Sequence, residues 1–230
     1  MNDTLLTILI AFGIVDLLAL FIYLIFKFSY NKHVEEVGHY GDRAEHLVQE
    51  YIHEHFPDAF LLNNLYFQTK HGLTQIDHIL ICRQGLYIIE TKSHNGHITV
   101  RERNWTQEYK GKNVAFHNPV KQNRAHVRAL KTVLASDEKF AHYRLGAVVV
   151  FTSKNVTFSE NVRGVIRLNR LADFIKRNPM VKKNRGVPGS MRTETMRRLK
   201  DTILKGAIKS RRKHQRHKTD MLNKFAEEGR

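Results

Sequence analysis

Residues 75–92 show the clearest pattern of apolar and polar positions in the chain. Two apolar runs rich in β-formers flank Arg83-Gln84-Gly85, and such a pattern predicts a β-hairpin. With the turn centred between Arg83 and Gln84, Asp77 faces Glu90 across the two strands. Facing residues share one side of an antiparallel pair, and Lys92 shares it too because it lies two residues after Glu90.

This register predicts two carboxylates and one ammonium group at a single place. Charges in apolar surroundings cost several kcal/mol unless they are paired or bind a metal. Two neighbouring carboxylates favour a hard cation, so we expect Asp77 and Glu90 to hold Mg²⁺ or Mn²⁺. Such a cation can polarise a phosphoryl oxygen, and Lys92 can orient the attacking water or stabilise developing charge. The simpler alternative is an ion pair at the edge of a sheet.

Helix and strand patterns alternate on both sides of this hairpin. Ala44, Val48 and Ile52 recur at helical spacing within residues 38–56, and a second helical pattern runs from Asn118-Pro119 to Leu134. Strands are predicted at 61–68, 96–101, 105–109 and 145–152, and the last of these is apolar throughout. The alternation predicts an α/β fold with a mixed sheet.

At these residues the chain resembles the PD-(D/E)xK nuclease superfamily, although Gln-Ile precedes Asp77 where Pro is typical. It is more closely similar to the nuclease-related domain called NERD. The similarity covers residues 38–155 and is carried by 41–45, 75–78, 85–98, Trp105 and 118–122. It implies a restriction-endonuclease-like mixed β-sheet core flanked by helices, with metal-dependent cleavage of DNA.

The resemblance also implies roles for two residues outside the hairpin. Glu45 matches the acidic residue on the helix, next to the apolar stripe of residues 38–56, and otherwise it is an exposed helix carboxylate. Gln122 lies in the first turn of the second helix and could bind a scissile phosphate or a metal-bound water. Otherwise Gln122 is a surface or capping residue.

The N-terminal part contains a long apolar stretch at residues 5–26. It holds sixteen Leu, Ile, Val or Phe residues and one charge, Asp16. At roughly −0.5 kcal/mol each, these residues outweigh about +3 kcal/mol for the central Asp, so we expect a transmembrane helix. Lys27 and Lys32 follow the stretch, whereas residues 1–4 lack Lys and Arg. The positive-inside rule therefore predicts a single-pass protein of the cell membrane, with its N-terminus outside and its main domain in the cytoplasm.

Two single residues add to this prediction. Asp16 is either a functional group within the membrane or a contact for self-association, and the absence of a second charge in the span favours self-association or snorkelling. Cys82 is the only cysteine, which excludes an internal disulfide and fits a reducing compartment. Its place in the hairpin indicates a buried structural thiol.

The positive charge is concentrated near the C-terminus. The chain has a net charge of +16, and residues 181–218 contain fourteen Lys or Arg against two acidic residues. Residues 191–208 form a basic amphipathic helical pattern, followed by a basic run from Arg211 to Lys218. Such a tail binds nucleic acid or anionic lipid, or remains solvated. Zinc-binding and nucleotide-binding motifs are absent from the sequence.

The sequence thus divides into a membrane anchor at residues 1–32, a nuclease-like domain at 33–178 and a basic helical tail at 179–230. Two functions fit this organisation. The first is a membrane-anchored nuclease that uses Asp77, Glu90, Lys92, Glu45 and Gln122. The second is a non-catalytic membrane-tethered scaffold with a nuclease-like fold, which binds nucleic acid or a protein.

Overall fold

The computed structural model describes residues 3–181, 184 and 190–208, with the backbone alone at 3–15, 26 and 28–39. The chain forms two compact units, residues 1–42 and 43–230. Helix α1 (Asp3–His55) contributes to both units. Among the described residues, no helix is both long enough and apolar enough to cross a membrane. Because the side chains of residues 5–15 lie outside the described part, the span at 5–26 stays a prediction.

The second unit is built on a five-stranded mixed sheet with the order β1-β2-β3-β7-β9. Strands β1, β2 and β3 pair antiparallel, whereas β3, β7 and β9 run parallel to one another. Their bounds are β1 Phe60–Thr69, β2 Gly72–Cys82, β3 Gly85–Lys92, β7 Gly146–Phe151 and β9 Val165–Arg167. The predicted mixed α/β class is therefore confirmed.

The β2–β3 hairpin has the register that the sequence predicts. Cys82 pairs with Gly85, and the last recorded pair is His78 with Ile89, one position before Asp77 and Glu90. Gly85 has a φ of 139°, and an added Cβ would lie 2.7 Å from Cβ of Met180. The turn therefore requires glycine at this position, and this requirement helps to hold the register.

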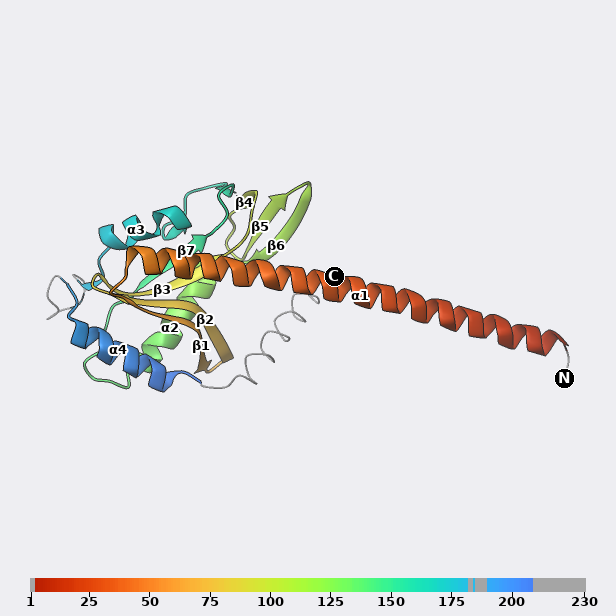
Figure 1. Cartoon of the computed structure of the whole chain (residues 1–230), viewed down its shortest axis with the longest axis horizontal. Helices are drawn as coiled ribbons and strands as arrows, with labels where there is room; N and C mark the ends of the chain where they lie inside the picture. Colours follow the sequence, from red (N-terminus) through yellow and green to blue (C-terminus); the bar gives the residue numbers. More distant parts are fainter. Residues whose placement is uncertain (1–2, 182–183, 185–189, 209–230) are drawn as a thin grey trace. The chain divides into compact units, whose positions relative to one another are not determined.

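Helices cover both faces of this sheet (Figure 1). On one face, α2 (Pro119–Leu134) and α4 (Thr193–Gly206) pack their apolar side chains against β1, β2 and β3. On the other face lie the last turns of α1 and helix α3 (Leu171–Arg177), which follows the short helix η1 (Leu168–Arg170). The apolar strand β7 and the apolar first part of β3 are buried because both of their faces are covered.

A second, four-stranded sheet has the order β6-β5-β4-β8. It consists of β4 His97–Thr99, β5 Asn104–Tyr109, β6 Lys112–His117 and β8 Thr157–Phe158. Three of these strands, β4 to β6, are inserted between the end of β3 and the beginning of α2. Trp105, Phe116 and Phe151 form the aromatic centre of the core that joins this sheet to the first one.

The C-terminal helix predicted at residues 191–208 is present as α4. Its buried residues Met196, Leu199 and Ile203 belong to the same core as α2, so this part of the predicted tail packs with the sheet. The basic run predicted from Arg211 to Lys218 lies outside the described residues. Cys82 is 2% exposed, and burial raises the pKa of its thiol to about 11, as a structural thiol requires.

Candidate active site

The end of β3 carries a buried ion pair. Glu90 is 1% exposed, and its Oε1 lies 2.8 Å from Nζ of Lys92. Burial alone would raise the pKa of Glu90, but the ammonium of Lys92 and the contact with His126 outweigh it and lower that pKa to about 2. Burial would lower the pKa of Lys92, but the charges of Glu90 and Asp77 outweigh it and raise that pKa. Both groups are therefore charged at neutral pH.

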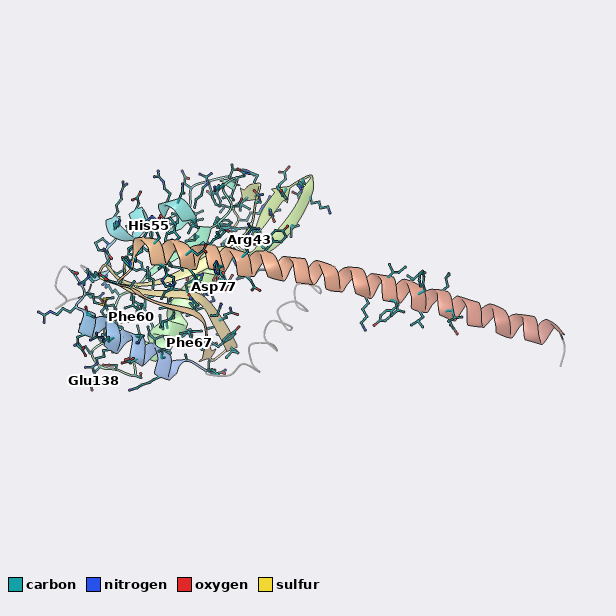
Figure 2. All side chains as sticks on the ribbon, viewed as in Figure 1. Arg43, His55, Phe60, Phe67, Asp77 and Glu138 are labelled. Atoms are coloured by element: carbon teal, nitrogen blue, oxygen red, sulfur yellow. The ribbon has the colours of Figure 1, made fainter. Side chains whose placement is uncertain are left out.

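Asp77 lies on β2 (Figure 2), and the register of the hairpin places it opposite Glu90 on β3. Its Oδ2 accepts a hydrogen bond of 2.9 Å from the backbone N–H of Thr91, between Glu90 and Lys92. Burial, followed by the negative charge of Glu90, raises the pKa of Asp77 well above its usual value, although Lys92 acts in the opposite direction. Asp77, Glu90 and Lys92 thus interact with one another, as the hairpin register predicts.

Helix α2 follows the inserted strands, and its first turns bring further polar side chains to the cluster. Asn118 caps the helix by accepting hydrogen bonds from the N–H groups of Val120 and Lys121. Four residues later, Oε1 of Gln122 accepts a hydrogen bond of 3.1 Å from Nζ of Lys92. Gln122 therefore reaches the predicted site and binds the ammonium of Lys92 from helix α2.

His126, which is not among the residues predicted from the sequence, also contacts this cluster. It lies one helical turn after Gln122, and its Nδ1 is 3.3 Å from Oε2 of Glu90. Both side chains are nearly inaccessible, at 4% and 2% exposure, and the contact lacks the alignment of a hydrogen bond. The spacing of four residues from Gln122 was the available signal, because it puts both side chains on one face of the helix.

Glu45 approaches the same cluster from α1. Its negative charge helps to raise the pKa values of both Asp77 and Lys92. Tyr66 on β1 is a further neighbour that the sequence analysis missed. Burial first, then the charges of Glu45 and Asp77, raise the pKa of Tyr66 to about 12, and its hydroxyl donates to Oε1 of Gln75. All five predicted site residues thus surround the end of the hairpin.

Two neutral histidines, the buried His78 and the partly buried His94, flank the cluster. Burial lowers the pKa of His78 to about 4, against the opposing influence of Glu90, and its Nδ1 lies 2.8 Å from Oδ1 of Asn63. Burial, with a smaller contribution from the charge of Lys92, lowers the pKa of His94 to about 3. At neutral pH these two histidines therefore add no positive charge beside the carboxylates, whereas Lys92 does.

The carboxylates fit a hard cation better than a transition metal. In the described part of the chain, no group of three or more His, Cys, Asp or Glu side chains is placed to hold a metal. Mg²⁺ commonly uses only one or two carboxylates and completes its shell with water and substrate phosphate. Burial first, and then the charge of Glu90, raise the pKa of Asp77, so the fold disfavours its charged form in the absence of a nearby cation. A divalent cation beside Asp77 and Glu90 would favour the charged form of Asp77.

One comparison with known protein families matches the part of the chain that contains these residues. Residues 40–152 match the NERD family, described as a nuclease-related domain, so the chain carries a NERD domain over these residues and the resemblance is confirmed. The chain is also similar to an uncharacterized protein of Bacillus anthracis. The two are 27% identical over 193 residues, which cover 82% of this chain and 86% of that protein. No solved structure matches the chain.

Proposed function

We propose that the protein is a metal-dependent nuclease that hydrolyses phosphodiester bonds in DNA. The observation that carries this proposal is the position of the Lys92 ammonium. It lies 2.8 Å from Glu90 and 3.1 Å from Gln122, on a strand whose neighbour brings Asp77 to the same place. Hydrolysis of a phosphodiester needs a positioned water and positive charge near the developing negative charge.

Each residue of the cluster has a distinct task under this proposal. Asp77 and Glu90 would hold Mg²⁺ or Mn²⁺, which supplies Lewis acidity at a phosphoryl oxygen when bound. Lys92 is held as an ammonium, so it donates hydrogen bonds to water or phosphate and does not accept the proton of the attacking water. Gln122 fixes the direction of this ammonium, and Glu45 adds negative charge that favours the cation.

We further propose that residues 5–26 anchor the protein in the cell membrane, with the NERD domain on the cytoplasmic side. In the first unit, the large apolar side chains from Leu17 to Ile25 are between 48% and 68% exposed. A continuous apolar surface of this kind is typical of a segment that contacts lipid or another protein. The basic C-terminal tail would add contacts with anionic lipid or nucleic acid.

The direct test is cleavage of plasmid DNA by the full-length protein with Mg²⁺, with Mn²⁺ and with EDTA. We expect cleavage with either metal, none with EDTA, and none by the Asp77→Ala and Lys92→Ala variants. The control is Lys139→Ala, which removes an exposed lysine outside the cluster. Intact DNA after incubation of the wild-type protein with both metals would overturn the proposal, and so would full activity of Lys92→Ala.

A second candidate function is a non-catalytic tether that binds DNA. It is favoured by the two contacts of Glu90, because Lys92 and His126 already engage one carboxylate oxygen each. Titration of the protein with Mn²⁺ separates the candidates. A nuclease binds the ion in a manner that depends on Asp77, whereas a tether leaves the ion unbound and the DNA affinity independent of metal.

A further inference from the structure

The hairpin formed by β5 and β6 is an exposed ribbon whose outer half packs against little else. Its strands pair from Asn104 with His117 to Tyr109 with Lys112. In β6 only Phe116 is buried, and in β5 only Trp105, so the hairpin is anchored at its base. In Figure 1 its tip points away from the five-stranded sheet.

The tip has a defined shape and carries positive charge. Lys110 and Gly111 both have positive φ, at 51° and 72°, as in the tight two-residue turns that match the twist of a hairpin. The ammonium of Lys110 lies 5.3 Å from the centre of the Tyr109 ring. Lys112 follows on β6, and Val114 is 53% exposed. The tip thus combines two cations with an aromatic ring and an aliphatic side chain.

A second basic segment lies at the base of the hairpin and is tied to the candidate active site. The side-chain amide of Asn118 donates to the backbone oxygens of Arg101 and Glu102, at 3.2 Å and 3.0 Å. The backbone N–H of Asn118 donates to the oxygen of Arg103. The side chains of Arg101 and Arg103 are exposed, and Asn118 begins the helix that carries Gln122.

The acidic residues of this region are fewer than its basic residues, so the region keeps an excess of positive charge. Glu102 is 3.2 Å from Nζ of Lys121 and is therefore partly balanced, and Glu108 is exposed on β5. The phosphates of DNA are evenly spaced negative charges. They can therefore contact the basic side chains at both ends of the ribbon. A two-stranded β-ribbon also has the width that the major groove of a DNA duplex admits.

We infer that this ribbon, together with the Arg101–Arg103 loop, is a contact surface for the backbone of double-stranded DNA. It holds the duplex beside the end of β3 and contributes no base-specific contacts. The choice of DNA as partner rests on the proposed nuclease function. The placement rests on the chain itself, because β4 to β6 are inserted between the two elements that carry Lys92 and Gln122.

The test is binding of a fluorescent DNA duplex to the full-length protein in EDTA, measured by anisotropy over a range of KCl concentrations. For Lys110→Ala/Lys112→Ala we expect about tenfold weaker binding near 0.15 M salt, and a slope of log affinity against log salt that is smaller by about 2. The matched control is Lys176→Ala/Arg177→Ala, which removes two exposed charges from α3. It should change the affinity by less than about twofold. The fluorescence of Trp105 reports whether each variant is folded.

The following outcomes bear on the inference. Equal losses in the tip and control variants, or no loss in either, would overturn it. Lysines on an edge strand also prevent strands of two copies from pairing. Dimers of the tip variant in sedimentation, with unchanged DNA affinity, would therefore assign this edge to protection against self-association and would also overturn the inference. If the wild-type protein binds through the tip but cleaves nothing with Mg²⁺ or Mn²⁺, the contact surface stands and the nuclease function falls.

Discussion

The end of the β2–β3 hairpin and the β5–β6 hairpin use charge in opposite ways. At the first, Glu90 and Lys92 are nearly buried and each has a partner within 3.3 Å. At the second, Lys110 and Lys112 are exposed. The energy of a buried charge depends on the identity of its partner and on the direction in which that partner lies. Exposed charges act mainly through their number, and salt screens them. The same residue type therefore serves two purposes in one domain.

The largest effect is expected from Lys92→Met. It should reduce DNA cleavage by about 10²-fold or more. It should also lower the free energy of unfolding by about 3–5 kcal/mol, because Glu90 is left buried without its closest cation. Urea unfolding followed by Trp105 fluorescence measures the second effect. The double variant Glu90→Gln/Lys92→Met should regain much of the stability but none of the activity. Equal stability of the single and double variants would contradict the coupling of the pair.

Asp77→Asn should separate activity from stability. We expect a similar loss of cleavage, because one of the two carboxylates proposed to hold the metal is gone. Stability at pH 7 should be equal to that of the wild type or greater, because the raised pKa of Asp77 shows that its charged form is unfavourable in the fold. The amide oxygen can still accept the hydrogen bond from Thr91. A loss of several kcal/mol in urea unfolding would show that the charge of Asp77 stabilises the fold.

His126 tests the contact that the sequence analysis missed. Its replacement by Ala should reduce cleavage about 10-fold to 100-fold and weaken Mn²⁺ binding in titration calorimetry, because Glu90 loses the group beside its second oxygen. His126→Gln can restore a donor at that place and should recover part of the Mn²⁺ affinity. Equal Mn²⁺ affinity in the Ala variant and the wild type would leave His126 with a packing role only.

The smallest predicted effect concerns pH. The pKa of His78 is about 4 in the fold and near 6.5 when unfolded, so the unfolded chain binds more protons between these values. Stability contributed by neutral His78 is complete above pH 6.5 and falls by about 2 kcal/mol between pH 7 and pH 5. Asp77 acts in the opposite direction, so the effect is measured as the difference between wild type and His78→Gln in urea unfolding. The control variant is His142→Gln, which replaces an exposed histidine outside the cluster.

The sequence predicts the buried part of the fold better than its periphery. The β2–β3 register follows from one short turn and two apolar runs, and the structure confirms it at Cys82 and Gly85. The strand at 145–152 and the helix after Asn118 are also confirmed. Strands β8 and β9 have only two and three residues, so their sequences hold too little periodicity to predict them.

Two features of the structure, one in the site and one in the core, could not be obtained from the sequence for physical reasons. A single histidine on a helix looks the same whether it packs in a core or contacts a carboxylate, so His126 gave no signal of its own. The basic side chains of α4 obscured its role in the core, although Leu199 and Ile203 are completely buried. In both cases the missing information is which face of a helix meets the sheet, and this depends on residues far away in the sequence.

The amide of Asn118 has a mechanical consequence. It joins the loop at Arg101 and Glu102 to the first turn of α2, and that turn carries the acceptor for Lys92. A force that pulls the loop outward must break these bonds or tilt the start of the helix. A displacement of the loop that contains Arg101 and Glu102 would therefore change the direction in which the ammonium of Lys92 points.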